Sequence, residues 1–425
     1  MKTRAVFALL VVAIAVTGLF YSARAKAAGV EIKKGEASLK LALFLQGWTT
    51  LEPNKAPSGK SIDLDLFLRR ARLLFIGKLN DVVQFFVETG SPNFGKHGNL
   101  DVDMFIQDAW AEFDIKDWLI VNAGMLLVPF SHHGMQGAFT LHGLDQHIDL
   151  IKYPRGSTRV WRDFGVMIRG LLLNRLLEYR VALLNGVHGD SSIENVTLDR
   201  MTWSQIKDPR NPHDWPRLTF RLALNIFDAD GDAGAGGFFY DGIYLKQTDQ
   251  GIISPSKVLS FGFSADWQRD LNVTWKQAQA GKIREIGSRT DYFAVAGDLF
   301  FDMPVDNEGL VGLCGQVNMY YYDHGSRSKT SAINSFYAGD SGLYTGVGLF
   351  TEAGIRYDAY ELMFGLDWFE ALKSVGDQGD LLTVLGGLNW WWLAQSTNLK
   401  IQFGVTQLEK QDWDFKAILQ AQLLF

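Results

Sequence analysis

The chain has 425 residues, of which 47% are hydrophobic, 13% aromatic and 21% charged, and it contains 43 glycines and a single cysteine. These values exclude an intrinsically disordered chain, a collagen and a disulfide scaffold. Past residue 20 no apolar run approaches the roughly 18 residues that a membrane-spanning helix needs, which argues against a helical membrane protein. The length fits two or three soluble domains or one large closed sheet.

The first 27 residues have the pattern of an export signal. Lys2 and Arg4 precede an apolar run over residues 5–20, and small residues with the A-x-A spacing follow, so we expect cleavage near Ala27. An uncleaved N-terminal anchor is the alternative interpretation. Removal of residues 1–27 takes away four basic residues and no acidic one, which moves the net charge from −6 to −10.

Apolar and polar residues alternate from residue 39 to the last residue. Between 399 and 406, for example, Leu, Ile, Phe and Val alternate with Lys, Gln, Gly and Thr. Such a period of two predicts strands with one apolar and one polar face. We predict sixteen strands, at 37–48, 63–79, 82–90, 102–115, 119–129, 162–174, 177–187, 216–227, 257–270, 290–303, 310–323, 346–357, 360–371, 380–394, 399–408 and 415–425.

The connections between these strands are alternately short and long. The long ones are polar and lie at 49–62, 91–101, 131–161, 188–215, 271–289 and 324–345. This alternation is typical of a transmembrane β-barrel with short periplasmic turns and long extracellular loops. The exception is 228–256, a long segment in a turn position, which could contain an extra hairpin around 238–245. Its acidic stretch, Asp228 to Asp232, has Phe239 where an EF-hand needs Glu, so we expect an acidic turn.

The fold that we predict is therefore all-β: an antiparallel transmembrane barrel of about sixteen strands over residues 28–425, in the bacterial outer membrane. Trp390, Trp391 and Trp392 lie at the expected periplasmic end of their strand, as in an aromatic girdle, while the alternation also makes Trp391 a candidate for the lumen side. The terminal Phe425 resembles the sorting signal that the barrel-assembly machinery recognises in outer-membrane proteins. A soluble secreted β-protein is the alternative.

Several segments resemble the phosphate-selective porin O/P family. They include FLRRARLLFIGKL at 67–79, NAGMLLVPFS at 122–131, RDFGVMIRG at 162–170 and AILQAQLLF at 417–425. The resemblance implies a sixteen-stranded outer-membrane channel, usually a trimer, with its third extracellular loop folded into the pore. Leu127 stands where the family often has a basic residue before VPF, and the mature chain is acidic, so phosphate selectivity is not carried over.

If the apolar side of each strand faces lipid, a set of charged residues faces the lumen. On the second strand these include Lys78, and the predicted pore-lining set is Arg70, Arg72, Glu88, Asp108, Glu112, Arg169, Arg217 and Arg221. Pairs across neighbouring strands would form an ion-pair ladder. Such a ladder either sets a transverse field across a wet pore or holds the barrel wall rigid, and both can be true.

The 131–161 loop is the expected pore constriction. It contains His132, His133, His142 and His147, and the basic residues Lys152, Arg155 and Arg159. The histidine spacing matches no strong metal-ligand pattern, so we expect solvated loop histidines and no metal. The alternatives are a metal site or a pH-sensitive constriction, because imidazole binds metal ions and changes charge near neutral pH. The basic residues line the pore or pair with the wall.

No pattern in the sequence indicates catalysis, so we expect neither an enzyme nor a cofactor. The acidic balance and the export signal also disfavour nucleic-acid binding. The leading hypothesis is a passive diffusion channel for small hydrophilic solutes and ions, with membrane lipid and lipopolysaccharide around it and a homotrimer as its assembly. The alternative is a structural or receptor-type barrel whose lumen is plugged or filled by a partner.

Overall fold

The computed structural model describes residues 30–101, 103–147, 150, 161–188, 211, 213–228, 245–247, 251–275, 286–324, 345–372 and 380–425. The predicted signal peptide, residues 1–27, lies outside the described residues. Helix is scarce in the described part of the chain, where η1 (Lys96–Gly98) and α2 (His132–Met135) have three and four residues. The described residues contain no helix of the length and apolarity that a membrane crossing requires.

Sixteen antiparallel strands form a closed barrel, as predicted. In chain order they are β2 (Ala37–Glu52), β3 (Asp63–Lys78), β4 (Val83–Phe94), β5 (Phe105–Lys116), β6 (Leu119–Leu127), β7 (Arg162–Leu172), β8 (Leu177–Leu184), β9 (Arg217–Asn225), β12 (Val258–Trp275), β13 (Ile286–Pro304), β14 (Val311–Asp323), β15 (Gly346–Tyr357), β16 (Tyr360–Ala371), β17 (Leu381–Gln395), β18 (Thr397–Leu408) and β19 (Asp414–Leu424). Each predicted strand is present, with its ends displaced by a few residues.

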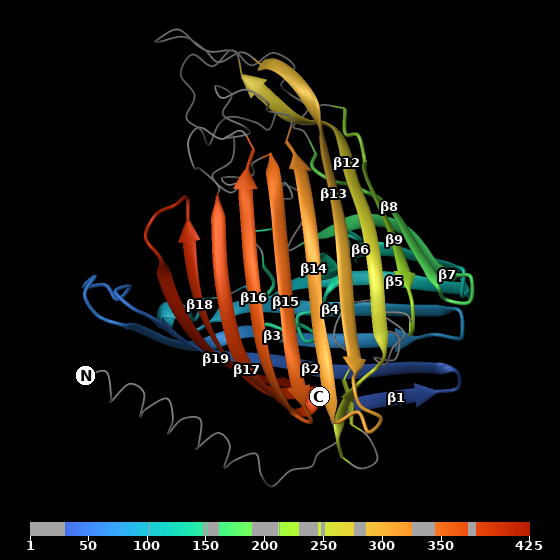
Figure 1. Ribbon diagram of the computed structural model, residues 1–425. Coiled ribbons are helices and arrows are strands. Elements are labelled where there is room, and N and C mark those ends of the chain that lie inside the picture. The colour runs from blue at the N-terminus through green and yellow to red at the C-terminus, as the bar shows by residue number, and fades with distance from the viewer. Residues whose placement is uncertain are drawn as a thin grey trace.

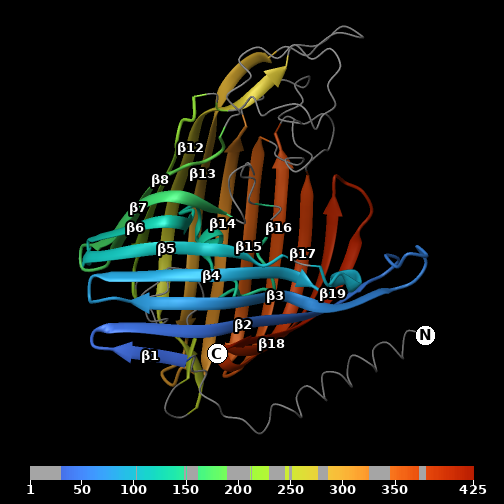
Figure 2. The ribbon, with the colours of Figure 1, turned by 180° about the vertical axis from the view of Figure 1, so that it is seen from behind.

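Two pairings between non-consecutive strands close the barrel. β9 pairs with β12 from Asn225↔Ser260 to Arg217↔Gln268, across the long 228–256 segment. β19 pairs with β2 from Ala417↔Leu51 to Leu424↔Phe44, which joins the two ends of the chain. Figure 1 shows β14 to β17 crossing β2 to β5 at a steep angle, and Figure 2 shows the same crossing from behind, as expected for the tilted strands of a barrel.

The alternating sequence pattern explains the two surfaces of this barrel. On β16, for example, Leu362 and Phe364 are exposed on the outside, whereas the intervening Met363 is buried inside. Successive side chains of a strand point to opposite faces, so the outer surface becomes apolar and the charged residues collect inside. A closed barrel with an apolar exterior satisfies its backbone hydrogen bonds in lipid, and it supports the predicted place in the bacterial outer membrane.

The tryptophan triplet divides between these two faces. The rings of Trp390 and Trp392 stack with centroids 6.1 Å apart on one side of β17. Trp391, between them, is fully buried on the other side. The interpretation of all three as an interface girdle is therefore wrong for Trp391, because strand alternation turns its side chain into the barrel.

Three short strands lie outside the predicted set. β1 (Val30–Lys34) pairs with the start of β2 and is exposed. β10 (Leu245–Gln247) and β11 (Ile253–Pro255) form a small hairpin within the exceptional 228–256 segment. Of the predicted acidic turn at 228–232, the structure describes Asp228 alone.

Candidate functional site

The charged residues of β3 to β7 form buried ion pairs on the inner wall. Arg72 Nη1 lies 2.5 Å from Glu88 Oε1. Arg162 binds Asp108 through two hydrogen bonds of 3.1 Å, in the bidentate geometry that guanidinium and carboxylate favour. On these strands acidic and basic side chains lie next to each other, so that each of these buried carboxylates has a cationic partner.

A second group of pairs lies on β9, β12 and β13. Arg217 binds Asp266 with hydrogen bonds of 2.7 and 2.5 Å, and Arg221 binds Asp298 with bonds of 2.6 and 2.9 Å. All four side chains are buried. Asp266 lies on β12, next to β9, and Asp298 lies one strand further, on β13, so the charges pair across strands as the sequence predicted.

The eight predicted pore-lining residues all take part in the charged network of the inner wall. Seven of them are buried, and the eighth, Arg169, keeps 19% of its side chain exposed while bonding Glu112 at 2.9 Å. Their role in lining an open pore stays a prediction. Lys78 differs, because it lies at the end of β3, is exposed and pairs with Asp81 of the following turn at 2.9 Å.

The described part of the 131–161 loop lies inside the barrel. Side chains on opposite walls bond its backbone: Asn318 accepts from the N–H of His133 at 3.1 Å, and Gln422 donates to the carbonyl of Phe139 at 3.2 Å. Lys400 donates to three successive carbonyls, from Leu141 to Gly143, at 2.6 to 3.3 Å. Irregular backbone inside a barrel needs such partners, and the polar wall provides them.

The four loop histidines are packed against the wall, so the expectation of solvated histidines is wrong. His132, His133 and His142 are at most 2% exposed, and the side chain of His147 is 9% exposed. His132 stacks on Phe300 with ring centroids 4.0 Å apart. The sequence could not show this, because the stacking partner is far away in the chain. Lys152, Arg155 and Arg159 lie outside the described residues.

Two ionised loop side chains fix the position of the loop in the lumen. Asp145 bonds both Arg69 and Arg70 of β3. Burial raises the pKa of Asp145, but the two guanidinium groups outweigh that effect and hold the pKa well below its usual range. Asp145 therefore stays ionised at neutral pH and anchors the loop to β3.

His147 provides a second attachment, to β15 and β16. Its Nδ1 bonds Asp367, and its Nε2 lies 3.4 Å from Glu352 Oε1. Burial lowers the pKa of His147, but the attraction of Asp367 and the bonds to both carboxylates raise the pKa to about 10. The imidazolium is thus present at neutral pH, and this part of the loop is held by a carboxylate bonded to β3 and a nearby cation bonded to β15 and β16.

A small cavity lies between the loop and the inner wall of β3 to β5. Its volume is about 60 Å³, and its lining includes Arg69, Arg70, Arg72, Gln107 and Gln146. The side chain of Arg69 is 22% exposed there. Three guanidinium groups around a space of this size form an environment that favours a small anion or water.

The β10–β11 hairpin packs at the end of the barrel where the short turns lie. Leu245 and Ile253 are buried in one apolar cluster with Val258, Phe300 and Trp391. The N–H of Ile253 also donates to Asp358 Oδ1 at 3.0 Å, in the turn before β16. The hairpin therefore covers part of this opening from within.

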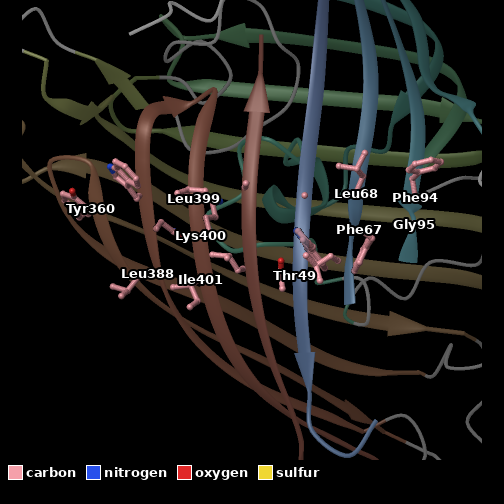
Figure 3. A pocket seen from close by; sticks show the side chains of 17 residues that line it. Thr49, Phe67, Leu68, Phe94, Gly95, Tyr360, Leu388, Leu399, Lys400 and Ile401 are labelled. Atoms are coloured by element: carbon pink, nitrogen blue, oxygen red, sulfur yellow. The ribbon is translucent and has the colours of Figure 1, made fainter. Parts of the chain in front are cut away.

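A larger groove of about 740 Å³ lies on the outer surface and is not part of the lumen. Gly47 of β2 and Ala421 of β19 face each other across the strand pair at this groove. Figure 3 shows Leu68 on one side and Leu388, Leu399 and Ile401 on the other. Exposed apolar side chains that point outward, such as Leu66 and Leu388, line the groove, so it faces the membrane, although the lining also includes inward-facing residues such as Lys400.

Three buried residues near the loop escaped the sequence interpretation. Cys314, Asp302 and Glu361 are each 1% exposed and lie on β14, β13 and β16. The alternating pattern places all three side chains on the lumen side of their strands, and Cys314 stands out as the single cysteine of the sequence. Their convergence on His142 could not be predicted, since Cys314 and His142 are 172 positions apart.

Comparison with known proteins gives one result at the level of fold. No protein-family model matches the chain, and no curated protein matches it. Among solved structures, OmpF of Salmonella typhi in complex with daunomycin is similar, with 11% identity, a TM-score of 0.56, and coverage of 93% of this chain and 100% of that chain. The chain has a porin-type barrel fold.

Two further structures support this assignment. The anion-selective porin from Comamonas acidovorans has 11% identity and a TM-score of 0.53, over 92% of this chain and 100% of that chain. The outer-membrane channel DcaP of Acinetobacter baumannii has 12% identity and a TM-score of 0.50, over 94% of this chain and 100% of that chain. At these identities the likeness concerns the fold, and no matching model supports the finer resemblance to the phosphate-selective porin O/P family.

Proposed function

We propose that the protein is an outer-membrane porin, a passive diffusion channel for small hydrophilic solutes and ions. The observation that carries this proposal is the loop over residues 131–147, which lies inside a charge-lined barrel and is bonded to β3 through Asp145 and to β16 through His147. A loop held inside a polar barrel narrows the passage and leaves the barrel wall intact. The fold shared with porins agrees with this function.

Transport through such a channel would be screened by size and by charge. Arg69 is part of the loop attachment at Asp145 and also lines the small cavity beside it. A fixed cation at a narrow, partly desolvated point attracts anions and repels cations. We therefore propose a modest preference for small anions. Membership of the phosphate-selective porin O/P family rests on the sequence motifs, and a specific phosphate site is not part of the proposal.

Single-channel recording tests the channel function. The refolded mature protein is inserted into a planar bilayer, and conductance is measured before and after a KCl gradient is applied. The expected result is steady current steps, with a reversal potential in the KCl gradient whose sign shows that anions pass more readily than cations. A folded barrel that carries no current would contradict the channel function, and a reversal potential on the cation side would contradict the proposed anion preference alone.

A second candidate function is a closed barrel that serves as a scaffold or receptor. It is favoured by a specific observation: Phe300 contacts the loop through His132 and belongs to the same apolar cluster as Leu245 and Ile253 of the hairpin. The loop from one end of the barrel and the hairpin from the other thus meet at the side chain of Phe300. Conductance separates the candidates, because a closed scaffold passes no current until the hairpin or the loop is displaced.

We also propose that the protein assembles as a homotrimer through the outer groove. Small residues such as Gly47 and Ala421 let two apolar surfaces approach closely in a membrane. A Cβ added at Gly47 meets no atom within 4 Å, so Gly47→Trp fills the groove without straining the barrel. Gly297→Trp, at another open glycine on β13, is the matched control. Native mass spectrometry should show a trimer for the control and monomers for Gly47→Trp; a trimer in both would contradict this interface.

The remaining partners follow from the predicted location. Membrane lipid and lipopolysaccharide would surround the apolar exterior, and the barrel-assembly machinery would recognise Phe425. The backbone of Phe425 is paired with Leu43 through hydrogen bonds of 2.7 and 3.1 Å, while its side chain is 46% exposed. Deletion of Phe425 should lower the amount of folded protein in the outer membrane, with Phe425→Tyr as the control that keeps a terminal aromatic ring.

A further inference from the structure

Three side chains of metal-binding chemistry converge where the loop meets the inner wall. His142 comes from the loop, Cys314 from near the start of β14, and Glu361 from the start of β16. Their ligand atoms lie within 4.8 Å of one another, and the residues are 2%, 1% and 1% exposed. The cluster is thus shielded from solvent and belongs to three separate segments of the chain.

The distances within the cluster agree with a tetrahedral ion. Cys314 Sγ lies 3.7 Å from His142 Nδ1 and 3.4 Å from Glu361 Oε2. Two ligands of a tetrahedral zinc ion are about 3.3 to 3.7 Å apart, given the usual zinc–nitrogen, zinc–oxygen and zinc–sulfur bond lengths. His142 Nδ1 and Glu361 Oε1 are closer, at 2.9 Å, because a hydrogen bond joins them. An ion between them would replace that bond with a separation a few tenths of an ångström longer.

A fourth oxygen is available next to the cluster. Asp302 lies directly opposite Cys314 in the β13–β14 pair, and it is 1% exposed. Its Oδ1 accepts a hydrogen bond from Arg356 at 3.1 Å, whereas Oδ2 has no hydrogen-bond partner among the described residues. A buried carboxylate oxygen without a partner is costly, and a cation is the partner that it favours most.

The surroundings hold the ligands in place. Arg356 donates to Glu361 Oε2 at 3.0 Å, and Asn389 donates to Glu361 Oε1 at 2.6 Å, so the carboxylate orientation is fixed from both sides. A glycine at position 354 leaves the space that the His142 ring occupies, since a Cβ there would lie 2.4 Å from the ring. Neighbouring residues that orient the ligand side chains in this way are typical of metal sites.

Binding of the ion requires the thiolate form of Cys314 and the neutral form of His142, because protein side chains bind metal ions in their deprotonated forms. The protons that these two groups carry pass to solvent on binding.

We propose that His142, Cys314 and Glu361, with Asp302 or water in the fourth position, bind one Zn²⁺ ion that fastens the lumen loop to β14 and β16. Thiolate, imidazole and carboxylate together select zinc over calcium or magnesium, which favour oxygen ligands alone. The ion has a structural role in this site, because its three buried ligands join the loop to β14 and β16. The proposal does not depend on whether the lumen conducts.

Metal content and cobalt spectroscopy of the full-length mature protein test this site. The protein is refolded in detergent with Zn²⁺ or Co²⁺, and free metal is removed by desalting. We expect roughly one ion per chain, and for Co²⁺ the near-ultraviolet charge-transfer band of a thiolate ligand with the visible bands of tetrahedral geometry. Cys314→Ser should abolish the thiolate band and lower retained metal at least about tenfold, and His142→Gln should lower metal retention similarly.

Two control variants separate this site from other histidines. His133→Gln changes a buried histidine of the same loop that is not a proposed ligand, and His97→Gln removes an exposed histidine that lies 3.3 Å from Asp65. Both should keep the ion and the thiolate band. If Cys314→Ser does not fold, the wild-type cobalt spectrum decides alone. A wild-type protein that retains no metal, or whose bound Co²⁺ shows no thiolate band, overturns the proposal.

Discussion

The imidazole ring of His132 lies parallel to the phenyl ring of Phe300, with 4.0 Å between the ring centroids and 17° between the planes. His132 is in α2, at the start of the lumen loop, and Phe300 is on the inner face of β13. Phe300 also belongs to the apolar cluster of the β10–β11 hairpin. The loop from one end of the barrel and the hairpin from the other are therefore supported by one wall residue.

This arrangement predicts that release of the hairpin opens the barrel. Ile253 is 2% exposed, and Ile253→Asp places a carboxylate among apolar side chains, which costs several kcal/mol unless the hairpin moves away. We expect a larger single-channel conductance for this variant, measured in planar bilayers. Val305→Asp, at an exposed position in the turn after β13, is the control and should leave the conductance unchanged. An unaltered conductance in Ile253→Asp would mean that the hairpin does not obstruct the lumen.

The His147 attachment predicts a stability change at alkaline pH. The pKa of His147 is about 10 in the folded protein, against an ordinary value of 6.5, because of Asp367 and Glu352. A raised pKa means that the contribution to stability is complete below pH 6.5 and is lost as the pH rises through about 10. Thermal unfolding of wild type and His147→Gln should therefore differ most at acidic and neutral pH, and the curves should converge above pH 10. A constant difference across this range would show that the imidazolium is not the stabilising species.

The sequence predicted the barrel well because its signal is local. A period of two over ten residues, as in β18 or β19, depends only on neighbours in the chain, and the closed barrel leaves each strand one lipid face and one lumen face. The triplet at Trp390–Trp392 shows where composition misleads. Aromatic residues suggested an interface, but the same alternation places Trp391 inside, where it is fully buried.

The interior was harder to predict because its contacts join distant residues. The inward orientation of Arg217 and Arg221 followed from parity, and their acidic partners lie on the neighbouring strand or one strand further. In contrast, His142 meets Cys314 and Glu361 only after the loop folds into the barrel, so nothing near His142 in the chain indicates its surroundings. A hairpin in the 228–256 segment was expected around 238–245, whereas the observed one pairs 245–247 with 253–255, since three-residue strands carry almost no periodic signal to place them.

The buried ion pairs predict that some lumen charges serve stability. Arg217 and Asp266 are 2% and 1% exposed, so Arg217→Met leaves a buried carboxylate without its bidentate partner. Loss of one member of a buried pair typically costs about 3–5 kcal/mol. Denaturant unfolding in detergent should show this loss. Lys416→Met breaks a more exposed pair with Glu52 and should have little effect on the free energy of unfolding. Equal effects of the two substitutions would contradict the distinction.

The partly exposed Arg69 predicts a change in ion preference. Arg69 lines the 60 Å³ cavity and shares Asp145 with Arg70, so Arg69→Gln removes a cation from the passage while Arg70 still holds the loop. A weaker positive potential admits cations more readily, so the reversal potential in a KCl gradient should shift toward the cation side. Lys55→Gln makes the same charge change at an exposed pair with Asp414, in the connector after β2, and should leave the reversal potential in place. Equal shifts in both variants would show that net charge governs selectivity, whereas a shift in Arg69→Gln alone would assign it to the constriction.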